Sequence, residues 1–357
     1  MTINVCTVVG ARPQFVKAAA VSAAFAEWNA AGGNAVRETI LHTGQHYDDA
    51  MSGVFFRQLG IPTPAIDLNI HGGTASENTA AMIVALSGQF AERRPDLVLL
   101  YGDTTSTLAA TIAAEQLRLP MSHVEAGPRM GNRDHPEEFN RIVADHAARW
   151  LFCPSELAAD NLRRENVTGT IEVCGDVMLD VVRRFLPFGR RPDLPSGFVL
   201  ATIHRPQNTD CRDRLAALVD GLGALGRPVL FACHPRTRAA LVRYGLDLPP
   251  TVIPSEPLDY LSLLGAVQEC AFVVTDSGGL PKEAGFLGKR SLTVSSESPW
   301  PELISAGTTR VVGADARALV ESADWASRPQ PDAARPFGHG YAGEKIARTI
   351  ALVSETP

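Results

Sequence analysis

Two periods of hydrophobic spacing alternate along this chain. Short apolar and β-branched runs predict strands, and the amphipathic or alanine-rich stretches between them predict helices. In the first half the predicted strands cover residues 3–9, 39–42, 97–101, 121–125 and 150–153, and the first two predicted helices cover 13–28 and 49–59. Strands that alternate with helices in this way are typical of a parallel, doubly wound sheet.

The same alternation begins again after Asp176. The predicted strands of the second half cover 198–203, 229–233, 272–275, 292–294 and 310–312. We therefore expect an α/β protein with two similar domains, residues 1–175 and 176–340. A last helix, predicted over 343–353 within the segment 341–357, is expected to pack back on the first domain. A cleft between two such domains is the natural place for a ligand.

Composition narrows the class of partner. A chain of 357 residues fits two domains of ordinary size, and its formal net charge of -6 comes from mixed signs without a basic stripe. Nucleic acid and anionic membranes are therefore unexpected partners, and a small molecule is expected. The six cysteines are scattered, the N-terminus reads as a strand rather than a leader, and no window is long and apolar enough to span a bilayer. These features predict a cytoplasmic location.

One glycine-rich turn is a candidate phosphate site. Ser277, Gly278 and Gly279 follow the strand predicted over 272–275 and open a helix that contains Glu283. Glycines let a ligand approach the backbone, and the free N–H groups and dipole of a helix start attract phosphate. An ordinary strand-to-helix turn has the same pattern, so both interpretations stand. Glu283 either holds ribose hydroxyls or is simply solvated.

The first half has an equivalent turn. Residues 10–13 form the turn after the first strand, with Pro13 suited to the first helical position. Arg12 lies in this turn, and Lys17 follows one turn into the helix. Two such cations could neutralise a diphosphate from the opposite side of a cleft. Lys17 taken alone is more typical of the solvated face of its helix.

Three acids follow predicted strand ends in the first half. They are Asp103 in YGDTT, Glu125 in HVEAG and Glu137 in HPEEFNR. The carboxyl edge of a parallel sheet is its ligand edge, so we expect these acids to converge. Arg141, four residues after Glu137, could lower the pKa of one acid while burial raises that of another, which suits proton transfer. Each acid alone is more typical of a helix cap or a loop hydrogen bond.

Two histidine–arginine groups end strands of the second half. His204 and Arg205 follow the strand over 198–203, and His234 follows the strand over 229–233. His204 with Arg205 fits a phosphate or sugar contact, whereas His234 fits a structural role equally well. The sequence has neither an H-E-x-x-H motif nor a carboxylate cluster at metal spacing, and no G-x-G-x-x-G follows a strand. We expect neither a metal nor a dinucleotide cofactor.

Taken together, these segments resemble the non-hydrolysing UDP-N-acetylglucosamine 2-epimerase family. The resemblance runs in order through GARPQFVKAA, TGQHYD, YGDTTSTLA, HVEAGPR, PEEFNR, ATIHRPQN, FACHPRTR and TDSGGLPKEA. It implies a glycosyltransferase-B-like fold of two Rossmann-like domains with the active site in the interdomain cleft, UDP held mainly by the second domain, and a homodimer.

The resemblance also implies roles for single residues. Asp103, Glu125 and Glu137 match the acid and base groups of the family, Arg141 matches the arginine beside them, and His204 matches a catalytic histidine near the diphosphate. The remaining matches are with residues that bind UDP or line the cleft: Arg12, Lys17, Ser277, Gly278, Gly279 and Glu283. Arg205 and His234 are expected beside them as UDP-binding residues.

Some positions depart from the family pattern. Tyr47 and Asp48 replace the residues typical of members that a second substrate molecule activates, so allosteric activation is not expected. Pro128 replaces a leucine, the loop 131–135 differs, and Trp300 replaces a family arginine. The GARPQF and TGQHYD segments and Trp300 look closer to a branch that acts on UDP-2,3-diacetamido-2,3-dideoxy-glucuronic acid.

The resemblance predicts an epimerase that interconverts UDP-N-acetylglucosamine and UDP-N-acetylmannosamine for cell-surface polysaccharide precursors. C2 of the sugar is not next to a carbonyl, so elimination of UDP to a 2-acetamidoglucal and re-addition is the expected route, with carboxylates for the proton and cations for the diphosphate. The alternatives are the diacetamido-glucuronate epimerase, a UDP-sugar-dependent glycosyltransferase of the same fold, a hydrolysing epimerase and a nucleotide-sugar-binding regulator.

Overall fold

The computed structural model describes residues 2–33, 35–45, 56, 58–132, 135–296, 298, 300–331 and 335–352. The chain divides into two compact units, Met1–Val181 with Phe337–Pro357, and Val182–Pro336. Most of the helix predicted over 49–59 lies outside the described residues, as do Tyr47 and Asp48.

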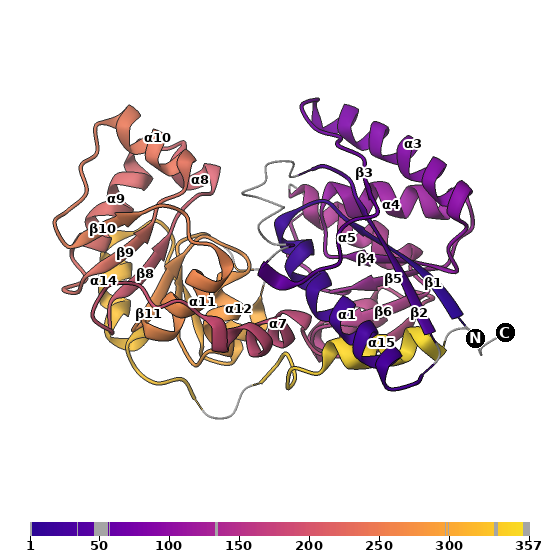
Figure 1. The fold of residues 1–357 in the computed structure, drawn as a ribbon. Helices are drawn as coiled ribbons and strands as arrows, with labels where there is room; N and C mark the ends of the chain where they lie inside the picture. Colours follow the sequence, from indigo (N-terminus) through magenta and orange to yellow (C-terminus); the bar gives the residue numbers. More distant parts are fainter. Residues whose placement is uncertain are drawn as a thin grey trace. The chain divides into compact units, whose positions relative to one another are not determined.

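The first unit is built on a parallel sheet (Figure 1). Among the described residues its strands follow the order β3-β2-β1-β4-β5-β6-β7. Their bounds are β1 Thr2–Val9, β2 Ala35–His42, β3 Ile66–Asp67, β4 Leu97–Tyr101, β5 Met121–Val124, β6 Trp150–Cys153 and β7 Thr170–Val173. The order runs one way from β1 and the other way from β4, which is the doubly wound arrangement.

Helices cover the sheet because their apolar faces need a partner. They are α1 Arg12–Ala30, α3 Ala75–Arg93, α4 Thr105–Gln116, α5 Pro136–Ala147, α6 Glu156–Arg164 and α15 Ala342–Leu352, while α7 Val177–Phe185 begins in this unit and ends in the second. One core joins strand side chains such as Val8, Val98 and Leu100 to Leu86 of α3 and Ala110 of α4. Burial of such side chains stabilises the unit by about 25 cal/mol for each Å² of apolar surface removed from water.

The C-terminal helix α15 belongs to the first unit and packs along α1 (Figure 1). A Cβ at Gly343 would lie 2.9 Å from the carbonyl oxygen of Ala20, so glycine allows the two helices to approach closely. The carboxylate of Asp180 accepts hydrogen bonds from the backbone N–H groups of Ala342 (3.2 Å) and Gly343 (2.9 Å). Those N–H groups have no partner within the helix, so Asp180 caps it.

The second unit repeats the design with the strand order β10-β9-β8-β11-β12-β13, again parallel, among the residues described for it. Its strands are β8 Val199–Thr202, β9 Val229–Ala232, β10 Val252–Ser255, β11 Phe272–Thr275, β12 Ser291–Thr293 and β13 Thr309–Val311. Its helices are η1 Leu186–Phe188, α8 Pro206–Thr209, α9 Arg212–Gly223, α10 Pro235–Tyr244, α11 Tyr260–Glu269, α12 Leu280–Phe286, α13 Pro301–Ser305 and α14 Ala316–Ala326. Separate hydrophobic clusters lie on the two faces of this sheet.

The predicted α/β class with two parallel, Rossmann-like sheets is confirmed. The strands predicted over 97–101, 150–153 and 272–275 have those bounds in the structure. Three strands were not predicted, namely β3, β7 and β10. Each lies at the edge of its sheet and is partly exposed, so its apolar signal is weak. Among the described helices, none is both long and apolar enough to cross a membrane.

Candidate active site

The strand order places one candidate site on each sheet. The order reverses between β1 and β4 in the first sheet and between β8 and β11 in the second. Successive connections leave such a point in opposite directions, so ligands bind there at the carboxyl ends of the strands. The predicted site residues follow these four strands and β5, the neighbour of β4, except His234, which follows β9.

The turn after β1 is fixed by Gln14, which sequence reasoning did not single out. Its Oε1 accepts a hydrogen bond from the backbone N–H of Gly10 at 2.8 Å, and its Nε2 donates to the carbonyl oxygen of Tyr101 at 3.0 Å, which joins the ends of β1 and β4. A Cβ at Gly10 would lie 2.0 Å from Oγ1 of Thr43 and 2.2 Å from Oγ of Ser106. Only glycine fits this turn. Its signal in the sequence was the G-A-R-P-Q order.

Lys17 and Glu125 meet at this edge. Nζ of Lys17 lies 2.5 Å from Oε1 of Glu125, and their side chains are only 8% and 10% exposed. Glu125 has φ of 69°, and Gly102 at the end of β4 has φ of 58°; a Cβ there would lie 2.9 Å from Nζ of Lys17. A non-glycine residue with positive φ is uncommon and costs energy, which the surrounding structure offsets here. The solvated alternative for Lys17 is therefore wrong.

Asp103 and Arg141 form a second ion pair. NH2 of Arg141 donates to Oδ2 of Asp103, and NH1 donates to Oε2 of Glu138 at 3.1 Å. Asn140 donates from Nδ2 to the carbonyl oxygen of Asp103 at 2.9 Å. Burial opposes the charge of Arg141, but the carboxylates of Asp103, Glu138 and Glu125 outweigh it and raise the pKa of the guanidinium. One buried cation thus lies in the field of three acids.

The two glutamates at the start of α5 have different surroundings. Glu137 is exposed, whereas Glu138 is 2% exposed and accepts hydrogen bonds from the backbone N–H groups of Met130 and Gly131 at 3.0 Å. The ion pairs described for Arg141 are with Asp103 and with Glu138, three residues before it in α5. The PEE motif contains both residues, and spacing alone did not separate them.

In the second unit, Asp276 orients His204. Asp276 follows β11, its side chain is fully buried, and its carboxylate accepts hydrogen bonds from the backbone N–H of His204 (3.0 Å), the backbone N–H of Arg205 (2.9 Å) and Nδ2 of Asn208 (3.0 Å). Nδ1 of His204 lies 3.1 Å from Oδ1 of Asp276. Burial would raise the pKa of Asp276, but its hydrogen bonds, first of all that with His204, lower it. An ionised Asp276 fixes the proton of His204 on Nδ1 and leaves Nε2 for a ligand.

Trp300 supports the loop 277–279 by a hydrogen bond to its backbone. Its Nε1 donates to the carbonyl oxygen of Gly278 at 2.6 Å, and Nζ of Lys282 lies 3.7 Å from the centre of the Trp300 ring. Ser277 is held by its backbone N–H, which donates to Oγ1 of Thr275 at 2.9 Å. Gly279 caps α12 with open space where a Cβ would stand. The loop is therefore fixed in place while its glycines stay accessible.

The other predicted contact residues are less buried, apart from Glu283. Arg12 is half-buried at the start of α1, Arg205 is half-buried, and Glu283 in α12 is 5% exposed, so the solvated alternative for Glu283 is wrong. His234 is exposed and caps α10, its Nδ1 accepting from the backbone N–H of Arg236 at 3.1 Å. The ring centres of His234 and His204 lie 5.7 Å apart.

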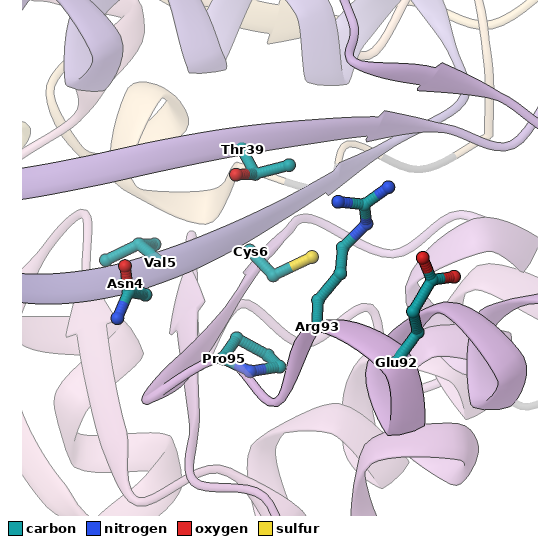
Figure 2. Close-up of a pocket in the computed structure, with 7 residues that line it drawn as sticks. All are labelled: Asn4, Val5, Cys6, Thr39, Glu92, Arg93 and Pro95. Atoms are coloured by element: carbon teal, nitrogen blue, oxygen red, sulfur yellow. The ribbon is translucent and has the colours of Figure 1, made fainter.

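A hollow of about 240 Å³ lies elsewhere in the first unit (Figure 2). It is lined by Asn4, Val5 and Cys6 of β1, Thr39 of β2, and Glu92, Arg93 and Pro95 before β4. This is the side from which β4 starts, away from the carboxyl ends of the strands. We assign it no part in the site.

Comparisons with known proteins identify the family of this chain. Residues 30–351 match the protein family described as UDP-N-acetylglucosamine 2-epimerase. The chain is 41% identical to the UDP-2,3-diacetamido-2,3-dideoxy-D-glucuronate 2-epimerase of Pseudomonas aeruginosa, with 98% of this chain and 99% of the relative covered. It is 30% identical to the UDP-N-acetylglucosamine 2-epimerase of Methanocaldococcus jannaschii, with 96% and 97% covered.

Solved structures that match this chain are also UDP-GlcNAc 2-epimerases. The M. jannaschii UDP-GlcNAc 2-epimerase in complex with UDP-GlcNAc and UDP matches with a TM-score of 0.89 at 30% identity, over 98% of this chain and all of that one. The UDP-GlcNAc 2-epimerase of Neisseria meningitidis bound to UDP-GlcNAc matches with a TM-score of 0.86 at 27% identity, over 98% and 99%. These likenesses confirm the glycosyltransferase-B-like fold class. The chain belongs to the UDP-N-acetylglucosamine 2-epimerase family.

Proposed function

We propose that this protein is a non-hydrolysing UDP-sugar 2-epimerase that interconverts UDP-N-acetylglucosamine and UDP-N-acetylmannosamine. The observation that supports this most is the set of acids on the first sheet: Asp103 and Glu125 follow neighbouring strands, and each is paired with a cation. A protein that only binds a nucleotide has no need of such a set. A 2-epimerase needs one group to remove a proton and another to return it.

The proposed reaction is an elimination followed by its reverse. A carboxylate removes the proton from C2 while the C1–O bond to UDP breaks, and a C1=C2 double bond forms in a 2-acetamidoglucal. A second acid then protonates C2 on the opposite face, and a diphosphate oxygen of UDP adds back to C1. The sugar has the same oxidation state at the start and the end, so the reaction calls for no redox cofactor.

We assign the proton transfers to the first unit and UDP to the second. Asp103, Glu125 and Glu137 serve as the acid and base groups, with Arg141 paired to Asp103 and Lys17 paired to Glu125. His204, with Nε2 available, and the glycine turn of residues 277–279 before α12 serve the diphosphate. Glu283 serves the ribose, and Arg12, Arg205 and His234 complete the UDP contacts.

The sugar itself has a second candidate. Identity is 41% to the relative named for UDP-2,3-diacetamido-2,3-dideoxy-D-glucuronate and 30% to the M. jannaschii relative named for UDP-N-acetylglucosamine. This difference favours a test of the diacetamido-glucuronate beside UDP-N-acetylglucosamine. Both sugars carry the 2-acetamido group that the proposed reaction needs.

Incubation in deuterated water without an acceptor tests the proposal. A 2-epimerase incorporates deuterium at C2 of recovered UDP-sugar and forms the C2 epimer, which mass spectrometry and proton NMR detect. A glycosyltransferase would give no exchange, a hydrolysing epimerase would accumulate UDP and free sugar, and a binding regulator would bind UDP without turnover. Any of these three results with both sugars would overturn the proposal.

Substitutions test the residue roles. Asp103→Asn and Glu137→Gln should each lower C2 exchange by about two to four orders of magnitude, the usual contribution of a general acid or base, with UDP affinity little changed. Glu115→Gln, an exposed glutamate at the end of α4, is the matched control. Exchange at the wild-type rate in Asp103→Asn and Glu137→Gln would remove the assigned roles.

We further propose a homodimer in the cytoplasm. α3 presents Val84 at 74% exposure, with Ala80, Ala81 and Gly88 also exposed on this helix, and such a surface suits a second copy. Six free cysteines, five of them buried, suit a reducing compartment. Light scattering of the purified protein should give twice the mass of the chain, and cell fractionation should place it in the cytoplasm.

A further inference from the structure

A histidine inside the first unit lies between two hydrogen-bond acceptors. His123, in β5, is fully buried. Its Nδ1 lies 2.7 Å from Oδ1 of Asp145, and its Nε2 lies 2.7 Å from the carbonyl oxygen of Gly102. A carboxylate and a carbonyl oxygen can only accept, so both ring nitrogens must donate. A neutral imidazole has a single N–H, and the ring that satisfies both contacts is therefore the imidazolium.

The surrounding charges make a buried imidazolium possible. Asp145 is also fully buried, and its Oδ2 accepts from NH1 of Arg129 at 2.7 Å. Arg129 also donates from Nε and NH2 to the carboxylate of Glu165 at 2.7 and 2.8 Å. Two cations thus face two anions. Burial would raise the pKa of Asp145, but His123 first and then Arg129 lower it, so Asp145 stays ionised.

This pair connects the segments that carry the proposed catalytic groups. Gly102, whose carbonyl oxygen His123 holds, immediately precedes Asp103. The other oxygen of Asp145 also accepts from the backbone N–H of Gly127 at 3.1 Å, two residues after Glu125. Asp145 lies on α5 one turn after Arg141. The turn after β4, the turn after β5 and helix α5 are therefore all tied to one ion pair.

We propose that His123, held as an imidazolium by Asp145, is a positioning residue that fixes Asp103 and Glu125 relative to α5. This inference rests on the proposed function for the identity of the reacting groups. His123 and Asp145 are fully buried, so neither touches the substrate. They act through the turns at Gly102 and Gly127.

The protonation of His123 is tested first, and independently of turnover. In protein labelled with ¹⁵N at histidine, both ring nitrogens of His123 should resonate at the protonated position at neutral pH, and the signals should disappear in His123→Asn. A His123 ring with one unprotonated nitrogen would overturn the proposal. This readout stays decisive even if the protein turns over no UDP-sugar, in which case the proposed function fails by itself.

Two near-isosteric variants separate the contacts. In His123→Asn the short amide can donate to Asp145 but does not reach Gly102, and in His123→Gln the amide can reach Gly102 while its oxygen faces the carboxylate of Asp145. We expect kcat for C2 exchange to fall by about 10- to 100-fold in both variants, the effect of a small misplacement of reacting groups, with the Kd for UDP changed less than about twofold.

A stability-matched control distinguishes positioning from general destabilisation. Leu86→Ala, in α3, removes a fully buried side chain of the same core from a helix that carries none of the residues of the ion pair, at a cost of about 2–5 kcal/mol. It should lower Tm at least as much as the His123 variants and leave kcat within about twofold of wild type. Hydrogen exchange at residues 102–104 and 125–127 should increase in the His123 variants and stay at the wild-type level in Leu86→Ala. An equal loss of kcat, or an equal increase in hydrogen exchange, in Leu86→Ala would overturn the proposal.

Discussion

The contact between Asp276 and His204 supports a sharp test of the second unit. Asp276→Asn keeps the shape of the side chain and removes its charge. The amide oxygen can still accept from the backbone N–H of Arg205 and from Asn208, but the amide NH2 then faces Nδ1 and the backbone N–H of His204. The contacts with Arg205 and Asn208 lose the charge of their acceptor, and the new amide donor faces the backbone N–H of His204, which is also a donor. At about 1 kcal/mol for each change, and more for the buried mismatch, the free energy of unfolding should fall by about 2–4 kcal/mol.

The same change alters the ring of His204. With an NH2 group facing Nδ1, the ring loses the anion that orients it and that stabilises positive charge on it where Nε2 faces the diphosphate. We expect C2 exchange to fall by about two to three orders of magnitude, the usual effect of losing one contact to the negative charge that develops on a leaving group. The Kd for UDP should change much less.

Urea unfolding and the deuterium-exchange assay measure these two effects. The pKa of Asp276 is lowered in the folded state, so its stabilisation is present above the ordinary value of 3.8 and is lost as pH falls through the folded pKa. The stability difference between Asp276→Asn and wild type should therefore be full at pH 7 and shrink below about pH 4. Thr202→Val, which removes the hydroxyl contact with Thr275 on the adjoining strands, is the control. Wild-type exchange by Asp276→Asn, with a wild-type pH profile, would refute the reasoning.

Four further substitutions test other parts of the structure. Gly10→Ala should destabilise by about 1–3 kcal/mol because its Cβ overlaps two hydroxyls, whereas Gly279→Ala should change stability by under about 1 kcal/mol and weaken UDP binding measured by calorimetry. Burial raises the pKa of Asp180 to about 6, so the stability that its protonation provides is complete below 3.8 and lost as pH rises through about 6. Asp180→Asn removes this titration but places an amide NH2 against one of the two backbone N–H groups that Asp180 accepts from, so its free energy of unfolding relative to wild type should be lowest at pH 4 and rise by roughly 2–3 kcal/mol on going to pH 7.5. Glu138→Gln should cost about 2–3 kcal/mol in urea unfolding, because it discharges a buried partner of a buried arginine. A neutral result for Gly10→Ala, a pH-independent difference for Asp180→Asn or full stability in Glu138→Gln would contradict the corresponding contact.

Local sequence signals were sufficient to predict the bounds of a strand where that strand is fully buried. The run at Leu97–Tyr101 is apolar at each position and buried on both faces, and its predicted bounds are those of β4. The edge strands β7 and β10 lack that signal because one side of each is partly exposed. The same logic holds for the site: Ser277 to Gly279 follow a buried strand, and the chain places them directly before a helix.

Contacts between distant segments could not be predicted in this way. Glu137 and Glu138 are adjacent and chemically alike, and only the packing of α5 decides that Glu138 is the one buried against Arg141. Asp276 orients His204 from 72 residues away, and Asp145 reaches His123 from 22 residues away. Gln14 has no distinguishing signal in the sequence, and only the structure shows that its side chain joins the ends of β1 and β4.

The sequence by itself determined the alternation of strands and helices, the parallel sheets and the chemistry at the strand ends, because hydrophobic period and glycine turns are properties of neighbouring residues. Only the tertiary structure decided which of these groups are paired, buried and held ionised. Pairing and burial depend on which segments the sheet order brings side by side. The pKa of a charged group shifts strongly only where the group is buried or lies next to a partner from another segment.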